Sequence, residues 1–109
     1  MQSTIILCGS DPSLLMTRQM LLERQGLRVT TLLGISLLDE AAGEVLVLCY
    51  TLTRRDQMIA VERYRSRFPQ GKVLLLGRDR PEVSCPECQT LPAYCGPRSF
   101  VEKVGSLVA

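Results

Sequence analysis

Five short apolar runs, each followed by a stretch that can form a helix, constrain the fold of this chain more than any other feature of its sequence. The runs occupy residues 4–8, 27–33, 44–50, 72–77 and 91–95. A regular alternation of strand and helix predicts a parallel sheet with helices on both faces. The third run, EVLVLCY, is apolar almost without interruption, which is typical of a strand covered on both sides.

The segments between these runs predict three helices of ordinary length and one short helix. The longer helices are expected at 12–25, 54–68 and 96–109, and the glycine-bounded segment 34–43 has room for a short one. Segment 78–90 is polar and contains prolines, and its pattern supports no assignment beyond one or two helical turns.

Apolar spacing predicts which helix faces are buried. In the first helix, Ser10 or Asp11 can act as the cap, Pro12 suits the first turn and Gly26 ends it. Its predicted buried face comprises Leu14, Leu15, Met20, Leu21 and Leu22, and its polar side comprises Thr17, Arg18, Glu23 and Arg24. The predicted stripes of the other two helices are Met58, Val61, Tyr64 and Phe68, then Phe100, Val101, Val104, Leu107 and Val108.

These elements predict a single α/β domain over residues 1–109. Five strands in a chain of 109 residues fit the flavodoxin-like sheet order 2-1-3-4-5, in which helices form a layer on each side of a parallel sheet. The strands' carboxyl ends then share one edge. Folds of this kind place their function in the crevice between strands 1 and 3 at that edge.

Composition argues against several classes of function. The net charge of +2 is too small to favour nucleic acid or an anionic membrane as a partner. The apolar runs are too short to span a bilayer, and the amino-terminal segment lacks the basic residues of a signal peptide, so a cytoplasmic protein is expected. The absence of histidine removes the commonest general base and metal ligand. No glycine-rich phosphate loop follows the first strand, and neither enzymatic activity nor a cofactor is expected.

The order of landmarks resembles the receiver domain (CheY-like) of bacterial two-component response regulators. The opening IILCGSDPSLLMTRQMLLERQGLRV is similar to the family's first strand, first helix and closing glycine. The segments EVLVLCYTLT, RFPQGKVLLLG and AYCGPRSFVEKVGSLV resemble its third strand, its approach to strand four, and its fifth strand with the last helix. The resemblance covers nearly the whole chain and implies the flavodoxin-like fold and a role in phosphorelay signalling.

The residues that perform phosphorylation in that family are all replaced. The resemblance places Gly9 and Ser10 at the acidic pair and Cys49 at the phosphoacceptor aspartate. It places Gly77 at the Thr or Ser that follows strand four, and Gly96 at the lysine before the final proline. We therefore interpret the chain as a degenerate pseudo-receiver.

The replacements remove the chemistry of the site. Magnesium requires oxygen ligands, whereas Gly9 has no side chain, Ser10 is neutral and Cys49 is a soft thiol. Asp11 lies nearby but is better interpreted as a helix cap. Without a metal ion or lysine, charge developing on a phosphoryl group has no counter-charge. Aspartyl phosphorylation is excluded by residue type on this alignment, and no metal site is assigned there.

The five cysteines leave alternatives open. Cys8, Cys49 and Cys95 stand at or beside the carboxyl ends of strands, and strand alternation predicts that Cys49 lines a vestigial pocket while the other two turn toward the helix layers. Cys85 and Cys88 form a lone CxxC pair, which is a weak signal for zinc or redox chemistry. They are expected to be structural thiols or a disulfide, and redox function at Cys49, Cys85 or Cys88 is the alternative.

The remaining candidates concern protein partners. The helix at 54–68 is rich in arginine, and Arg54 and Arg55 are candidates for contacting an acidic partner. The resemblance implies a partner or homodimer face over residues 81–109, with Tyr94 in the place of the family's aromatic switch residue. We predict a phosphorylation-independent protein-interaction module; the alternative is a small thiol-redox or metal-binding protein.

Overall fold

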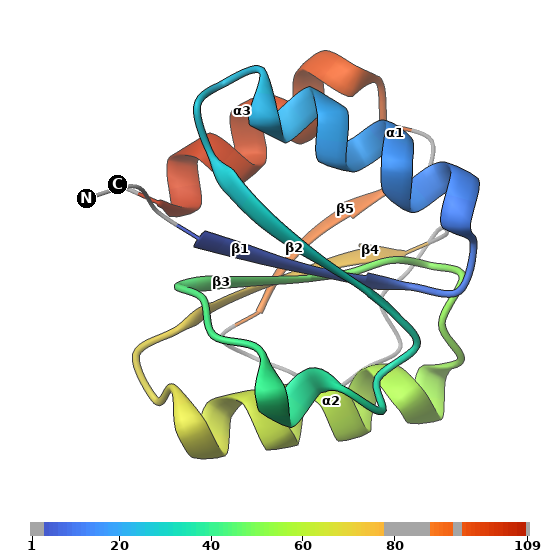
Figure 1. Ribbon diagram of the computed structural model, residues 1–109, viewed down its shortest axis with the longest axis vertical. Helices are drawn as coiled ribbons and strands as arrows, with labels where there is room; N and C mark the ends of the chain where they lie inside the picture. Colours follow the sequence, from blue (N-terminus) through green and yellow to red (C-terminus); the bar gives the residue numbers. More distant parts are fainter. Residues whose placement is uncertain (1–3, 78–87, 93–94, 109) are drawn as a thin grey trace.

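The computed structural model describes residues 4–77, 88–92 and 95–108, and its elements alternate as the sequence predicts (Figure 1). The strands are β1 (Thr4–Gly9), β2 (Arg28–Leu33), β3 (Val45–Leu48), β4 (Lys72–Gly77) and β5 (Gln89–Pro92). The helices are α1 (Pro12–Glu23), α2 (Arg54–Arg67) and α3 (Pro97–Leu107), together with one 3-10 turn, η1 (Leu38–Glu40).

The strands form a single parallel sheet in the order β2-β1-β3-β4-β5, which confirms the flavodoxin-like fold. Figure 1 shows α1 and α3 on one face of this sheet and α2 on the other. Because every strand runs in the same direction, the carboxyl ends of β1, β3 and β4 meet at one edge. The predicted crevice between the first and third strands therefore exists as a feature of the topology.

Strand alternation divides the core into two apolar layers. Residues Ile5 and Leu7 of β1 pack under α1 and α3, while Ile6 and Cys8 pack against α2. The same alternation continues in β3 and β4, whose central residues are almost completely buried. The period of two in the strands thus assigns each side chain to one of the two helix layers.

Local signals position the first two helices. The Asp11 carboxylate accepts hydrogen bonds from the backbone N–H groups of Ser13 and Leu14 at 3.0 and 3.3 Å, so Asp11 is the N-cap of α1. Gly26 has a φ of +82°, which ends the helix turn in a conformation that favours glycine. Thr53 caps α2 by accepting a 3.1 Å hydrogen bond from the Asp56 N–H.

Two predicted helix faces were partly wrong. In α1 the buried residues are Leu15, Arg18 and Leu22, whereas Met20 is 50% exposed. The buried stripe runs through positions spaced by three and four, and it includes an arginine that was expected on the solvent side. Met58, expected in the core stripe of α2, is also 50% exposed.

Two element assignments also need correction. Strand β5 was expected at 91–95 but begins at Gln89, because an edge strand exposes Gln89 and Thr90 and its sequence therefore lacks an apolar signal. Segment 34–43 holds only the 3-10 turn η1 and no α-helix. Arg67 Nη1 donates to the carbonyl oxygens of Leu38 and Ala41, at 3.0 and 2.8 Å, and so satisfies carbonyl groups of this short connection.

Candidate functional site at the carboxyl edge of the sheet

Gly9 and Cys49 lie in direct contact at the ends of β1 and β3. A Cβ atom built on Gly9 would lie 3.2 Å from both Cβ and Sγ of Cys49 and 3.1 Å from Leu15 Cδ2. The Cys49 thiol and the leucine methyl therefore occupy the space beside Gly9. The structure brings together these two predicted site residues, but it leaves hardly any room for a side chain at position 9.

Ser10 links the loops that follow β1 and β3. Its N–H donates a 2.9 Å hydrogen bond to Thr51 Oγ1, and its hydroxyl donates a 2.8 Å hydrogen bond to the Thr51 carbonyl oxygen. Gln57 Nε2 donates a 3.0 Å hydrogen bond to the Cys49 carbonyl oxygen. The loops that follow β1 and β3 are thus tied to each other and to α2.

Asp11 is the carboxylate nearest in sequence to this edge, and one of its oxygens is used by the helix cap described above. Within residues 4–77, 88–92 and 95–108, no group of three or more histidine, cysteine, aspartate or glutamate side chains is arranged to hold a metal ion. The described part of this edge therefore offers no cluster of oxygen ligands of the kind that magnesium prefers.

Arg18 is the residue that the sequence interpretation missed. It is 9% exposed, and its guanidinium carbon lies 5.8 Å from the ring centres of both Tyr50 and Phe100. Such distances are typical of cation–π contacts. The signal that could have revealed it is the spacing of Leu15, Arg18 and Leu22, which places an arginine on the buried stripe of α1.

The guanidinium of Arg18 faces the thiol of Cys49. Burial raises the pKa of the Cys49 thiol, and Arg18 opposes this increase through its charge and a side-chain hydrogen bond to the sulfur. Cys49 is only 1% exposed and belongs to the α1–α3 core. The sequence predicted that Cys49 lines a vestigial pocket; the structure instead places the thiol in the core, where α1 covers it.

The other buried thiol has a different environment. Cys8 points to the α2 side, as strand alternation predicted, and it is fully buried. Burial, together with the nearby Cys49, raises its pKa to about 12. Cys95 is half-buried and packs against the α1–α3 core, as expected for a thiol turned toward a helix layer. Cys8, Cys49 and Cys95 are free thiols.

The remaining predicted positions are only partly described. A Cβ atom at Gly77 or Gly96 would meet nothing within 4 Å, so backbone packing does not require glycine at either position. Cys88 is disulfide-bonded and packs against the α2 side of the core. Cys85 and Tyr94, together with most of the segment 78–90, lie outside the described residues.

Two of the predicted interaction residues, Arg54 and Arg55, lie on α2, on the opposite side of the sheet from Arg18. Arg54 and Arg55 line a shallow hollow of about 690 Å³ on α2, together with Met58, Ile59 and Glu62. On the predicted 81–109 face, Lys103 Nζ of α3 donates a 2.9 Å hydrogen bond to Gln89 Oε1 of β5. None of the helices in the described ranges combines the length and apolar character needed to cross a bilayer.

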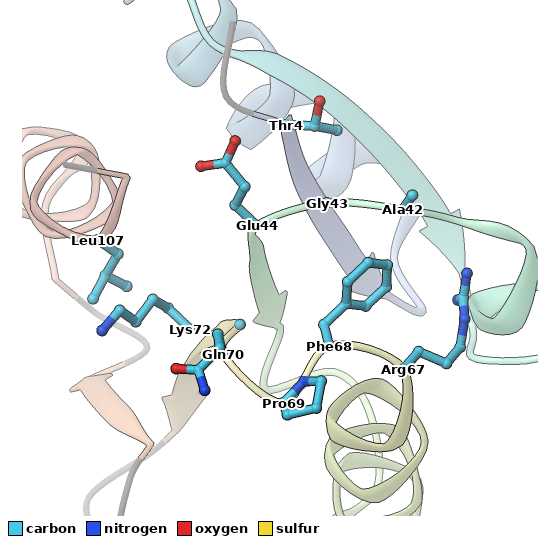
Figure 2. A pocket seen from close by; sticks show the side chains of 11 residues that line it. Thr4, Ala42, Gly43, Glu44, Arg67, Phe68, Pro69, Gln70, Lys72 and Leu107 are labelled. Atoms are coloured by element: carbon cyan, nitrogen blue, oxygen red, sulfur yellow. The ribbon is translucent and has the colours of Figure 1, made fainter. Parts of the chain in front are cut away.

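A further hollow of about 650 Å³ lies at the amino edge of the sheet, far from Cys49 (Figure 2). Figure 2 shows Arg67 and Phe68 at the end of α2 and Leu107 at the end of α3, on either side of the Gly43 backbone. Its lining is mainly apolar, with charged groups at Glu44, Arg67 and Lys72. No residue predicted as a site lines this hollow.

Comparison with known proteins places the fold among receiver domains. No protein-family model and no curated protein sequence matches the chain. Solved structures do match it: a receiver protein from Sinorhizobium medicae has a TM-score of 0.84 at 17% identity, with 98% of this chain and 94% of that one covered. A CheY-like receiver domain from Methanospirillum hungatei has a TM-score of 0.83 at 15% identity, covering 97% and 93%.

A third structure, the BeF3-activated receiver domain of DrrB, has a TM-score of 0.80 at 22% identity and covers 98% of this chain and 97% of that one. At these identities the similarity defines the fold. The chain therefore has the fold of the CheY-like receiver domains of response regulators.

Proposed function

We propose that this chain is a pseudo-receiver: a protein-interaction module of two-component signalling that works without phosphorylation and without catalysis. The observation that carries the proposal is the identity of the groups at this edge: the Cys49 thiol lies beside Gly9, and the buried Arg18 guanidinium faces that thiol, in place of clustered carboxylates. A cation at this position repels magnesium and provides no ligand for it.

The hydrogen bonds between the loops at the carboxyl edge of the sheet support the same proposal. Ser10 and Thr51 link the loops after β1 and β3 through two hydrogen bonds. These bonds form between residues of the protein itself and need no phosphoryl group, so they favour a single conformation of the loops at this edge. A module with a single conformation presents its binding surface constitutively.

The surface of α2 is the best candidate for partner contact. Met58 is half exposed at a hollow that Arg55 and Glu62 also line, so an apolar anchor is surrounded by charged side chains. Centres of this composition are typical of protein–protein interfaces, which combine an apolar core with a polar rim. The face formed by β5 and α3 is the second candidate, and it is the one a homodimer would use.

Incubation with acetyl phosphate and magnesium tests the first half of the proposal. We expect the intact mass to remain unchanged, while an active receiver domain treated in parallel gains one phosphoryl group. An alkali-labile mass gain of one phosphoryl group on this chain would refute it.

Affinity capture from the native host with matched variants tests the second half. Arg55→Glu combined with Met58→Ser should lose a partner that the wild-type chain retains. Arg24→Glu is the control, because Arg24 is exposed on α1 at the other face of the sheet. Equal capture by all three proteins would exclude the α2 surface.

A thiol-redox protein is the second candidate, because Cys88 is disulfide-bonded. The metal-binding alternative requires this cysteine in its reduced form. Counting free thiols with and without reductant, and measuring zinc in the purified protein, separates the two functions. Stoichiometric zinc, or reversible loss of activity toward a partner on reduction, would favour the second candidate.

A further inference from the structure

Arg18 carries a buried guanidinium, one nitrogen of which has no hydrogen-bond acceptor among the described residues. Arg18 is 9% exposed, and among residues 4–77, 88–92 and 95–108 its buried Nη1 atom finds no hydrogen-bond partner. Arginine stays protonated at any physiological pH, so this is a permanent positive charge. Its aromatic neighbours Tyr50 and Phe100 supply π faces, which satisfy a cation only in part.

No carboxylate of the described residues pairs with Arg18. Buried charges are normally paired, because an unpaired ion in an apolar interior loses its hydration without compensation. The titratable side chain that Arg18 faces is Cys49, which in its thiol form is neutral. The described residues of the reduced protein therefore place no anion beside this cation.

Cys8 provides an internal comparison. Cys8 and Cys49 lie on adjacent strands, and the Cys49 N–H donates a 2.9 Å hydrogen bond to the Cys8 carbonyl oxygen. Both thiols are free and almost completely buried, but Cys8 points to the α2 side, away from Arg18. The pair therefore differs chiefly in the presence of the guanidinium.

We propose that Cys49 is a site of oxidation by hydroperoxides and that Arg18 is the preformed counter-ion of its oxidised, anionic form. Oxidation places an oxygen atom on the sulfur, and this oxygen accepts a hydrogen bond from the guanidinium and carries the compensating charge. The oxidised protein then holds a buried ion pair where the described residues of the reduced protein offer this cation no anion.

The chemistry is balanced with one peroxide for each oxygen added. The Cys49 sulfur attacks one oxygen of hydrogen peroxide, the O–O bond breaks, and the departing hydroxide takes the thiol proton to form water. The sulfur loses two electrons and becomes a sulfenic acid, which releases its proton to water during the same local opening and pairs with Arg18. A second peroxide converts the sulfenate to a sulfinate in the same way.

Burial gives this modification a characteristic signature. Hydrogen peroxide is neutral and small, so it reaches the thiol through local opening of the fold, more slowly than it reaches the half-buried Cys95. Larger reagents and thiols are excluded, so the product persists. An unfolded chain loses this protection.

Peroxide treatment of the native wild-type protein, followed by peptide mass analysis, is the first test. We expect the Cys49 peptide to gain one or two oxygen atoms while Cys8 remains a thiol. A cyclic dione that traps sulfenic acids should label Cys49 only after unfolding. Unmodified Cys49, or equal oxidation of Cys8 and Cys49, would overturn the proposal.

The second test measures the thermal stability of oxidised and reduced protein in wild type and in Arg18→Met. Oxidation should raise the Tm of the wild type by about 3 °C or more and lower that of the variant, because the new anion has no counter-ion there. In Arg18→Lys, which keeps the charge, oxidation should raise the Tm, as in the wild type. The same sign of shift in wild type and Arg18→Met would contradict a role for the charge.

A third test keeps Arg18 and so does not depend on that variant folding. Aspartate resembles a cysteine sulfinate in shape and charge, so Cys49→Asp should have a Tm at least as high as that of the neutral isostere Cys49→Asn. The difference in Tm between the two variants should disappear as the pH falls and the carboxylate is protonated. A Cys49→Asn protein that is more stable at neutral pH would overturn the proposal.

These tests are independent of the proposed signalling function. They measure added oxygen and Tm, whereas the pseudo-receiver proposal is tested by phosphoryl transfer and partner capture. Either proposal can fail while the other stands.

Discussion

The hydroxyl of Tyr64 in α2 donates a 2.8 Å hydrogen bond to the carbonyl oxygen of Gly43, the second residue before β3. Tyr64 is 1% exposed, and burial, with the Glu44 charge adding to it, raises its pKa to about 12. The bond therefore stays intact at neutral pH and fixes α2 to the loop before β3. Gly43 accepts this bond and Gly71 lies against the Tyr64 ring. Both glycines line the hollow at the amino edge of the sheet, which is drawn in Figure 2.

Replacing Tyr64 with phenylalanine should lower the free energy of unfolding by about 1–2 kcal/mol, because the Gly43 carbonyl loses its donor while the ring packing remains. Urea unfolding followed by circular dichroism measures the change. A loss below the error of the extrapolation would mean that water replaces the hydroxyl at no cost.

Gly71→Ala should destabilise the protein more strongly than Tyr64→Phe. A Cβ atom at position 71 would lie 2.5 and 2.6 Å from Cε2 and Cζ of Tyr64, so the buried ring or the loop must move. Overpacking of this kind costs about 1–3 kcal/mol. Gly105→Ala is the matched control: it lies inside α3 with open space around it and should stabilise the protein by about 0.5–1 kcal/mol. Equal effects of the two substitutions would disprove the contact.

Gly9→Ala should cost about 1–3 kcal/mol, because its Cβ would meet the Cys49 thiol and the Leu15 methyl group at 3.1–3.2 Å. On a Cys49→Ala background the cost should be smaller, since the Sγ atom is gone. A double-mutant cycle in denaturant measures this coupling. Additive effects would show that the two residues do not compete for space.

Alkaline pH should destabilise the protein through its buried thiols. The pKa of Cys8 is raised from 9.0 to about 12 on folding, so its contribution is fully present below pH 9 and is lost as the pH rises toward 12. At a pH of about 10 this one group should remove roughly 1 kcal/mol. Unfolding free energies measured under reductant from neutral pH upward should fall less steeply in Cys8→Ala. Parallel curves for the two proteins would contradict the assignment.

Arg67→Met should loosen the connection between β2 and β3, because its Nη1 atom donates to the carbonyl oxygens of Leu38 and Ala41. Hydrogen exchange of residues 35–44 should accelerate, and stability should fall by about 1 kcal/mol. Arg63→Met, on an exposed position of the same helix, is the control and should leave this exchange unchanged. Acceleration in both variants, or in neither, would argue against the specific contact.

The apolar periodicity predicted the strands and the two-sided burial of Val45–Leu48, and together with the handedness of crossovers it pointed to the flavodoxin-like strand order. The prediction succeeded because alternation and burial are local consequences of strand geometry, so neighbouring residues show them as a pattern in the sequence. The cap at Asp11 and the turn at Gly26 were also predictable, since each depends on the chemistry of a few adjacent residues.

The environment of Cys49 depended on the tertiary structure. Arg18 precedes this thiol by 31 positions in the chain, and no local sequence pattern predicts that the two side chains meet. In the structure, the Arg18 guanidinium lies near the rings of Tyr50 and Phe100 and faces the thiol. The polar strand β5 was misplaced for a related reason: its pairing with β4 comes from backbone hydrogen bonds, which any side chain permits at an exposed edge. Contacts between residues far apart in sequence are set by packing, and packing arises only when the sheet and its helices come together.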